Sequence, residues 1–431
     1  MSLEKGKNIV LVWVYISILF YAVYKLSFAW SYQGIYFYTP HIEGILFSYL
    51  TAIIPVFFLP KRLRLPSDYV NIYIYVFTFI PSASVPFVLI NPSKFNYQYY
   101  IFVIVFLISL LYLLRKSGYR RHFLSSINPL SVKMMPIIFI GVYIISFALF
   151  ISTFGLRFSI PSLSDVYDVR AQYKEITEGN ILTRYLVGWM GYVVNIFLLL
   201  YALQTKNLKL LIFSVVFQLY IFTLMALKSH LAAYILAALL FFVFKKYRTL
   251  SSFKFLAFTV IFILSLSFVD FITGNDLLEM LITRRIMVVP SQLTYYHFDF
   301  FEHRSKTYWA FSVFKDIFSY PYKLPPPNII GEKHFGNEKM TAVVNLFIEG
   351  YTAFGYCGVV MVTLLLKELL KAIDYMFIKR SGRNMIIVII LLGLCNIINS
   401  TSIFTMLLTH GWFILILLIT IFPWKVLKES S

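Results

Sequence analysis

Three arginines and one lysine fall in segments that we predict to lie outside a membrane, where their charge could hold a phosphate group. Arg170, Arg284 and Arg285 carry a planar guanidinium, which pairs with phosphate through two parallel hydrogen bonds and stays charged at any relevant pH. Lys228 lies at a short turn on the same side. We predict that these four residues bind the diphosphate of a lipid-linked substrate. The alternative is that the arginines contact ordinary lipid headgroups or pair with nearby acids such as Glu279.

Acids and histidines near the same surface could accept the proton of an attacking hydroxyl group. Asn345, Glu349, Thr352 and Tyr356 recur at helical spacing and form one stripe. An ionisable group within a membrane span usually faces a cavity or a partner, which favours Glu349. The full set of candidate bases is Glu349, His297, Asp299, His303 and Glu338. The sequence leaves the choice among them open, and we interpret His410, in the last apolar run, as a hydrogen-bonded core residue.

Aromatic and amide side chains supply candidate sugar contacts. Tyr295 and Tyr296 follow the arginine pair closely and could stack on sugar rings, and Asn345 begins the polar stripe. The chain has no nucleotide-binding glycine loop, no HExxH and no Cys-x-x-Cys motif, so we expect neither a cofactor nor a metal. Cys357 and Cys395 fall inside predicted spans, and we interpret both as small buried apolar residues.

The elements that must position these residues are membrane-spanning helices. Hydrophobic residues make up 60% of the 431 residues and charged residues only 13%, a composition typical of integral membrane proteins. A helical span needs about twenty apolar residues. Such runs recur at 8–29, 42–60, 69–91, 97–114, 134–153, 183–204, 208–227, 230–244, 253–270, 342–366, 384–403 and 405–424. We therefore predict an all-α polytopic membrane protein with about twelve transmembrane helices, forming a single integral membrane domain over residues 1–431.

The distribution of lysine and arginine predicts the orientation. The chain holds 38 lysines and arginines against 19 acids, a net charge of +19. Cytoplasmic loops are enriched in basic residues, and with twelve spans the basic groups within 61–64, 115–121, 245–248 and 367–383 all fall on one side. Both termini are then cytoplasmic. The charge follows from topology and gives no reason to expect a nucleic-acid partner.

Two segments on the other side of the membrane are long enough to carry a site. They span residues 154–182 and 270–340, and long loops in compact proteins are usually functional. Apolar residues recur at helical spacing between 277 and 282, which predicts a short amphipathic helix lying on the membrane surface. Such a helix would hold Arg284 and Arg285 at the height of the lipid headgroups.

This arrangement resembles the Wzy-type O-antigen polymerases, the bacterial family that joins oligosaccharide repeat units on a polyprenyl diphosphate carrier. The likeness extends over the whole chain in its architecture of many spans and a large late outer loop. Local matches are Asp-Val-Tyr-Asp-Val-Arg ending at Arg170, Lys228-Ser229-His230, Arg284-Arg285 followed by Val-Val-Pro, Tyr295-Tyr296, and residues 345–358. Lys228 stands where an arginine is often seen in the family.

The resemblance implies a glycosyltransferase of lipopolysaccharide biosynthesis in the bacterial inner membrane, with a GT-C-like helical fold. Such an enzyme transfers a glycan from undecaprenyl diphosphate to a sugar hydroxyl of the next lipid-linked unit on the periplasmic face. It also implies a partner protein that regulates chain length. The segments 154–182 and 270–340 would then be periplasmic loops, the second containing short amphipathic helices.

Two other functions remain open at this point. A transporter or flippase of lipid-linked oligosaccharide fits the number of spans, but such folds often have repeated halves and the sequence shows no convincing repeat. An O-antigen ligase, which transfers the finished glycan to a lipid core, would use the same chemistry as a polymerase.

Overall fold

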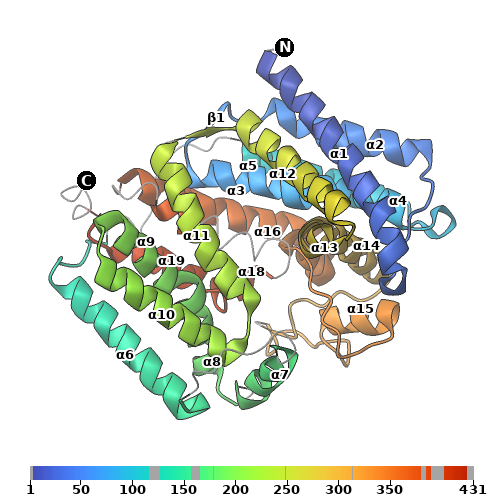
Figure 1. Cartoon of the computed structure of the whole chain (residues 1–431). Helices are drawn as coiled ribbons and strands as arrows, with labels where there is room; N and C mark the ends of the chain where they lie inside the picture. Colours follow the sequence, from blue (N-terminus) through green and yellow to red (C-terminus); the bar gives the residue numbers. More distant parts are fainter. Residues whose placement is uncertain are drawn as a thin grey trace.

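Helices form nearly all of the described chain (Figure 1). The computed structural model describes residues 3–115, 127–156, 166–177, 179–247, 249–312, 314–379, 385–389 and 402–424. Within these residues, eight helical segments are long and apolar enough to cross a membrane, which supports an all-α multi-pass membrane protein. The segments are Leu3–Gln33 (α1 Leu3–Trp30, η1 Ser31–Gln33), Pro66–Leu89 (α3 Pro66–Tyr73, η3 Ile74–Phe79, α4 Ile80–Leu89), α6 Met134–Phe154, Ile181–Thr205 (α8 Ile181–Trp189, η6 Met190–Val194, α9 Asn195–Thr205), α10 Leu208–Met225, α11 Lys228–Lys246, α12 Ser252–Thr273 and α16 Leu346–Lys379.

The remaining elements are shorter. Three of them are apolar and coincide with further expected spans: α2 Ile42–Ile53 with η2 Ile54–Phe57, α5 Tyr99–Leu114 and α19 Trp412–Ile421. The others are η4 Pro92–Lys94, α7 Val166–Thr177, α13 Leu277–Glu279, η7 Met280–Val288, α14 Val289–Glu302, α15 Pro326–Phe335, α18 Ile403–Leu407, β1 Arg62–Leu63 and β2 Leu250–Ser251. The expected span 384–403 lies largely outside the described residues.

Local sequence explains where these helices begin and end. At the start of α12 the Ser251 hydroxyl accepts a hydrogen bond from the amide of Lys254, as a helix N-cap does. The same helix ends at Gly274, whose φ of +67° is a left-handed conformation that suits glycine. Along the helices, large apolar side chains such as Ile137 and Phe271 are exposed, as expected for faces that meet lipid rather than water. Cys357 is exposed as well, which corrects its interpretation as a buried residue, and Cys395 lies outside the described residues.

Residues 277–302 form one continuous helical segment packed into the bundle. The expected amphipathic stretch corresponds to α13 and the start of η7, where Leu277 and Leu281 are exposed. It continues into α14, which packs against α4, α5 and α16 and buries Leu293 and Phe298. The early part of segment 270–340 is therefore a helix held inside the protein, and its polar side chains have fixed neighbours.

The bundle has two ends that different elements form. One end, called here the α15 end, holds α13, α15 and the first residues of α11 and α16 (Figure 1). The other, called the β1–β2 end, holds the short antiparallel pairing of β1 with β2, in which Arg62 lies opposite Ser251. Helix α16 has 34 residues and kinks at Phe354–Gly355. Gly350 packs against Gly358, so the part before the kink folds against the part after it, and residues 356–379, at a rise of about 1.5 Å per residue, are by themselves long enough to cross a bilayer.

Candidate functional site

Arg284 is a buried guanidinium at the α15 end. It lies in η7, a π-helical segment of the kind often found at functional sites. Only 8% of the residue is exposed, its Nη1 donates a hydrogen bond to Oε1 of Gln33 at 2.6 Å, and its guanidinium lies 3.9 Å from the ring centre of Trp30. Its Nε has no hydrogen-bond partner, and no ion pair to Arg284 is seen in the described residues. Burial, and then the charge of Arg285, lower the pKa of Arg284 below its usual value.

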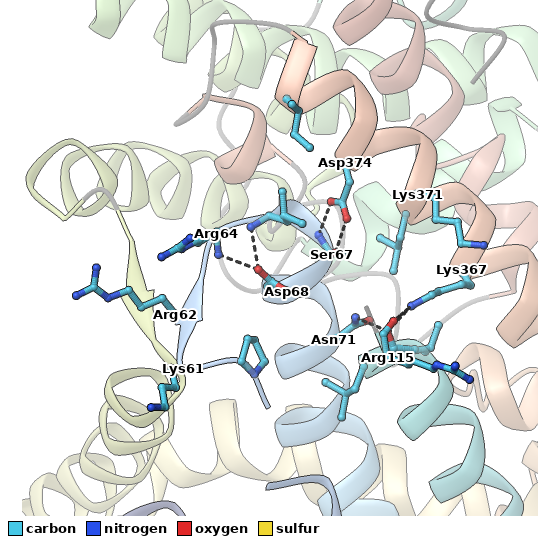
Figure 2. Close-up of a pocket in the computed structure, with 16 residues that line it drawn as sticks. Lys61, Arg62, Arg64, Ser67, Asp68, Asn71, Arg115, Lys367, Lys371 and Asp374 are labelled. Atoms are coloured by element: carbon cyan, nitrogen blue, oxygen red, sulfur yellow. Dashed lines mark hydrogen bonds between the residues drawn. The ribbon is translucent and has the colours of Figure 1, made fainter. Parts of the chain in front are cut away.

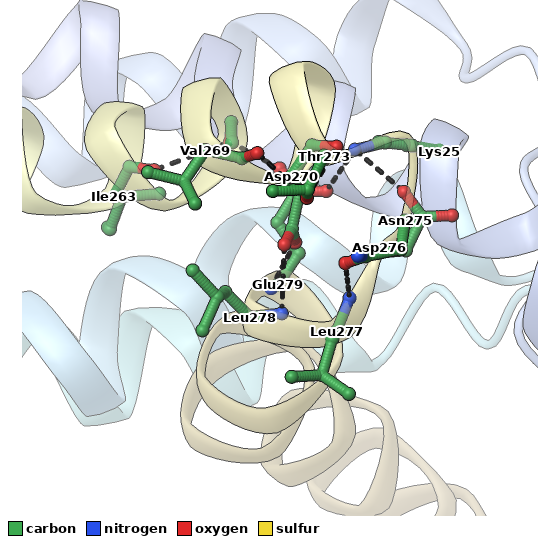
Figure 3. A network of polar contacts seen from close by, with 11 residues as sticks. Lys25, Ile263, Val269, Asp270, Thr273, Asn275, Asp276, Leu277, Leu278 and Glu279 are labelled. Carbon is green, nitrogen blue, oxygen red and sulfur yellow. Dashed lines mark hydrogen bonds and ion pairs between the residues drawn. The ribbon is translucent and has the colours of Figure 1, made fainter.

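The acids closest in sequence to Arg284 are engaged elsewhere. Asp276 and Glu279 form ion pairs of 2.8 Å and 3.0 Å with Lys25 of α1 (Figure 3). The carboxylate of Asp270 accepts hydrogen bonds from the amides of Leu278 and Glu279. This network fixes the corner between α12 and α13 and binds it to α1. The alternative that Arg284 is neutralised by Glu279 is therefore not the arrangement observed, and the neighbouring Arg285 is exposed.

A pocket of about 270 Å³ opens beside α14. The candidate residues Tyr295, Tyr296 and Asp299 line it together with His334 of α15 and Lys94. The rings of Tyr296 and His334 stack, with centres 4.0 Å apart and planes within 6°. Burial lowers the pKa of His334 to about 4, so its ring is neutral at pH 7. Aromatic rings, a carboxylate and a lysine around one small cavity are suited to hold a sugar with its hydroxyl groups.

Hydrogen bonds connect Arg284 to this pocket. Gln292, one turn before Tyr296 on α14, donates from Nε2 to the carbonyl of Gly34 at 2.9 Å and to the Tyr296 hydroxyl at 3.2 Å. Gln33, the hydrogen-bond partner of Arg284, immediately precedes Gly34. The buried guanidinium and the aromatic pocket therefore share the short segment that follows α1.

Glu349 is held by Trp309 in a second cluster at the same end. The Nε1 of Trp309 donates a hydrogen bond to Oε1 of Glu349 at 2.7 Å, whereas the buried Oε2 has no hydrogen-bond partner in the described residues. Tyr308 and Trp309 both have positive φ values, 52° and 53°, which are unusual for bulky side chains. The amides of Thr307 and Tyr308 bond to carbonyls of α16 beside its kink, and this fixes the strained turn that positions Trp309.

The structure gives His297 and Asn345 buried positions. His297 is 1% exposed, its Nε2 lies 3.0 Å from the carbonyl of Ala342, and burial lowers its pKa to about 4. Asn345 caps α16, because its Oδ1 accepts hydrogen bonds from the amides of Phe347 and Ile348. Its Nδ2 donates to Thr294. Both side chains are therefore hydrogen-bonded where α14 packs against α16.

The remaining candidate bases lie on the surface. The His303 side chain is 81% exposed and lies 3.5 Å from the carboxylate of Glu302. Glu338 is exposed, and its backbone carbonyl accepts a hydrogen bond from Asn328. Asp299 and Glu302 both accept hydrogen bonds from the amide of Asn96. Asp299 is half-buried, so of the acids predicted from the sequence Asp299 and Glu349 are the partly buried, hydrogen-bonded ones, whereas Glu338 is exposed.

Arg170 and Lys228 belong to a third cluster. Arg170 on α7 donates through Nε and Nη2 to the carbonyl of Ala226, at 3.2 and 3.1 Å. Ala226 is the left-handed C-cap of α10, so the guanidinium lies at a helix C-terminus, where positive charge is favourable. Lys228 is exposed two residues later, and the hydroxyl of the adjacent Ser229 lies 3.0 Å from that of Tyr192.

The predicted arginines therefore lie in two separate clusters, Arg284 with Arg285 and Arg170 with Lys228. The segment around α18 connects the Arg170 cluster to the Glu349 cluster. Its Phe404 packs on Trp309, and the ring of His410 lies 5.8 Å from that of Tyr192. His410 itself precedes the capping Gly411 of α19, whereas the sequence suggested a position inside the span.

Sequence reasoning missed several residues of the site. Trp309 and Gln33 hold Glu349 and Arg284, and His334 completes the aromatic pocket. Lys306 was also missed: its ammonium lies 4.3 Å from the ring centre of Tyr351, and burial lowers its pKa to about 8. Each of these residues is ordinary in its local sequence, so no sequence signal could have found them, and in three dimensions Trp309 is further marked by its positive φ.

The fold and these clusters define a multi-pass α-helical membrane protein with polar sites at the α15 end. Among the described residues, no group of three or more histidines, cysteines or acids is arranged to hold a metal ion. Comparison with protein-family models, with curated proteins and with solved structures finds no match for the chain.

Proposed function

We propose that the protein is a Wzy-type glycosyltransferase that polymerises lipid-linked oligosaccharide repeat units. In this proposal twelve helices cross the bacterial inner membrane in a GT-C-like arrangement, both termini are cytoplasmic, and the α15 end faces the periplasm. The substrate is an oligosaccharide on polyprenyl diphosphate, and a separate regulator protein sets the chain length.

The observation that carries the proposal is the buried guanidinium of Arg284 near an aromatic pocket, hydrogen-bonded to Gln33 but with no acid paired to it among the described residues. A buried charge is costly unless it is paired, so a site of this kind is stabilised by an anionic ligand. A diphosphate supplies that anion, and its attached sugar would reach Tyr295 and Tyr296. Preorganised cations of this type also stabilise the charge that develops on a departing diphosphate.

Glu349 is the base that the geometry favours. In the proposed reaction the bond between the anomeric carbon and the diphosphate oxygen breaks, and the acceptor hydroxyl oxygen bonds to that carbon. The hydroxyl proton passes to Glu349, and both electrons of the broken bond leave with the diphosphate, which stays on its lipid. The unpartnered Oε2 of Glu349 is free to receive the proton, while Trp309 holds Oε1.

The other candidate residues take supporting roles in the proposal. Asp299 accepts hydrogen bonds from sugar hydroxyls in the aromatic pocket, beside Tyr295 and Tyr296. Arg170 and Lys228 lie beyond α18, where they would attract the diphosphate of the second lipid-linked unit.

The direct test is a reconstituted reaction. Purified protein in liposomes is given a lipid-diphosphate-linked repeat unit, and the products are separated by size while released polyprenyl diphosphate is measured. We expect polymer and lipid diphosphate to appear together, in wild type but not in Arg284→Ala. Release of lipid diphosphate without polymer, or polymer formation unaffected by Arg284→Ala, would contradict the proposal.

Gene deletion in the native host separates the proposal from the two alternatives. Loss of a polymerase leaves single repeat units attached to the surface lipid, whereas loss of a ligase leaves none attached. Loss of a flippase strands the units on the cytoplasmic side.

A further inference from the structure

A cavity at the β1–β2 end is not used by the proposed function. It has a volume of about 680 Å³ and lies between the segment that leads into α3, the end of α5 and the second half of α16 (Figure 2). The residues that carry its polar lining are Lys61, Arg62, Arg64, Ser67, Asp68, Asn71, Arg115, Lys367, Lys371 and Asp374. Its size is in the range of cavities that bind small molecules and headgroups.

Positive charge dominates this cavity. Six of the lining side chains are cationic and two are acidic. In the described part of the chain the only ion pair formed by any of the six cations is that of Lys371 with Glu368. The cations therefore surround the cavity with little internal neutralisation, Lys61, Arg62 and Arg64 on one side and Arg115, Lys367 and Lys371 on the other (Figure 2).

The two acids of the cavity hold its walls together. Asp68 accepts hydrogen bonds from the amides of Arg64 and Leu65, at 2.8 and 3.0 Å. Asp374 on α16 accepts one from the amide and one from the hydroxyl of Ser67. Both carboxylates thus fasten the segment before α3 and attach it to α16, which fixes where Arg64 stands.

Further contacts fix the other walls. Lys367 is 7% exposed and donates hydrogen bonds to the carbonyls of Leu113 and Arg115, at 2.7 and 2.6 Å. This attaches the end of α5 to α16 and places Arg115 at the rim. On the opposite side Arg62 is held in the β1–β2 pairing. The cavity is therefore a built structure, and its cations do not lie on a loose loop.

Asn71 supplies a second, independent indication of a ligand. It is 5% exposed and lines the cavity, and its Nδ2 donates to the carbonyl of Leu113 at 2.9 Å. Its Oδ1 is buried and has no hydrogen-bond partner in the described residues. A buried acceptor of this kind is costly unless a donor reaches it. A ligand that satisfies this oxygen must present an O–H or N–H donor.

Membrane topology alone does not account for this arrangement. The orientation rule is satisfied by basic residues anywhere in a cytoplasmic loop. It does not require residues from three separate segments to meet around one cavity with an unpaired acceptor. Basic pockets between transmembrane helices are, in contrast, a known way of holding anionic lipid headgroups.

We propose that this cavity binds a phosphate group that carries a neighbouring hydroxyl, as the headgroup of phosphatidylglycerol does. The phosphate lies beside Arg115 and the neighbouring lysines of α16, the cations around Arg64 attract it from the opposite wall, and the hydroxyl donates to Oδ1 of Asn71. The lipid chains extend into the bilayer leaflet at the β1–β2 end. A bound headgroup would tie α3, α5 and α16 together at this end, and it would do so independently of chemistry at the α15 end.

The test measures thermal unfolding of the purified, delipidated full-length protein in detergent. The probes are dioleoyl-phosphatidylglycerol, dioleoyl-phosphatidylcholine and soluble glycerol 3-phosphate, and native mass spectrometry counts bound lipid. We expect phosphatidylglycerol, but not phosphatidylcholine, to raise the unfolding temperature. Arg64→Gln/Arg115→Gln should weaken the apparent affinity about tenfold or more, as expected for loss of two cationic contacts.

Matched variants make the outcome decisive. Lys206→Gln/Lys209→Gln removes two exposed cations outside the cavity and should respond like wild type. If the Arg64/Arg115 variant does not fold, Lys61→Gln/Arg62→Gln on the exposed side takes its place. A response to glycerol 3-phosphate alone supports the same phosphate and hydroxyl chemistry and assigns it to a soluble ligand. Equal responses of cavity and control variants, or equal responses to the two lipids, would overturn the proposal.

Discussion

The indole of Trp309 donates a hydrogen bond to Glu349 at 2.7 Å across a turn in which two bulky residues have positive φ. The turn is held by hydrogen bonds from Thr307 and Tyr308 to the carbonyls beside the kink of α16. Such strain persists only when its surroundings enforce it, and it concentrates at functional sites. One oxygen of Glu349 is therefore fixed, and the other has no hydrogen-bond partner among the described residues.

Glu349→Gln is expected to lower the rate of polymer formation by a factor of about 100 or more, because a general base of this kind accelerates a reaction by roughly 10²–10⁴. Trp309→Phe keeps the packing but loses the hydrogen bond, and it should lower kcat about tenfold with little change in KM. Rates are measured in the reconstituted reaction at equal protein levels. The control is Glu332→Gln, an exposed glutamate of α15. Wild-type kcat for Glu349→Gln would exclude it as the base.

Arg284→Ala and Arg284→Lys are both expected to lose long polymer. Lysine keeps the charge, but it lacks the planar fork that pairs with Gln33 and lies over Trp30. Arg285→Ala should have a smaller effect, because Arg285 is exposed. The measurement is the chain-length distribution at equal membrane content of each variant. If Arg284→Lys made chains of wild-type length, the planar guanidinium would not be needed to bind the diphosphate.

Asp299→Asn should raise KM for the lipid-linked donor about tenfold while changing kcat little. The reason is that Asp299 lines the aromatic pocket that would hold the donor sugar, and the amide replaces one of its acceptor oxygens with a hydrogen-bond donor. Kinetics at varied donor concentration check this. A loss confined to kcat would instead make Asp299 a candidate base.

Asn345→Ala is expected to destabilise the protein by about 1 kcal/mol, the usual cost of losing an N-cap. Its amide caps α16 and bonds to Thr294, so the loss concerns the attachment of α16 to α14. Thermal unfolding in detergent gives the stability, and steady-state kinetics at low temperature give KM. A normal unfolding temperature with a raised KM would instead indicate that Asn345 contacts the sugar.

Stability should rise as the pH is raised from about 4 to 6.5. Burial lowers the pKa values of His297 and His334 to about 4, so across this range the unfolded chain binds more protons than the folded protein. Raising the pH therefore favours the folded state until the unfolded histidines also lose their protons. His334→Phe keeps a ring against Tyr296 and removes one titrating group. Unfolding temperatures measured across this range should depend less steeply on pH in this variant, and an unchanged slope would contradict the assignment.

The amino-acid sequence by itself determined that this protein is a bundle of membrane helices. Apolar runs of span length must be helical in a bilayer, because no water is present to bond the backbone. The boundaries of α10, α12 and the turn at Lys228 follow from such local features. The sequence also predicted that Arg284 lies beside a short helical stretch.

Only the tertiary structure decided which polar residues meet. Arg284 reaches Gln33 across most of the chain, and Asp299 shares a pocket with His334 of another helix. Periodicity identifies the face of a helix but not the helix that packs against it, so neither contact could be read from spacing. Helix packing likewise places Arg170 in a different cluster from Arg284, and it brings Arg64, Arg115 and Lys367 to the lining of one cavity. Those contacts depend on the packing of whole helices, which the local sequence does not encode residue by residue.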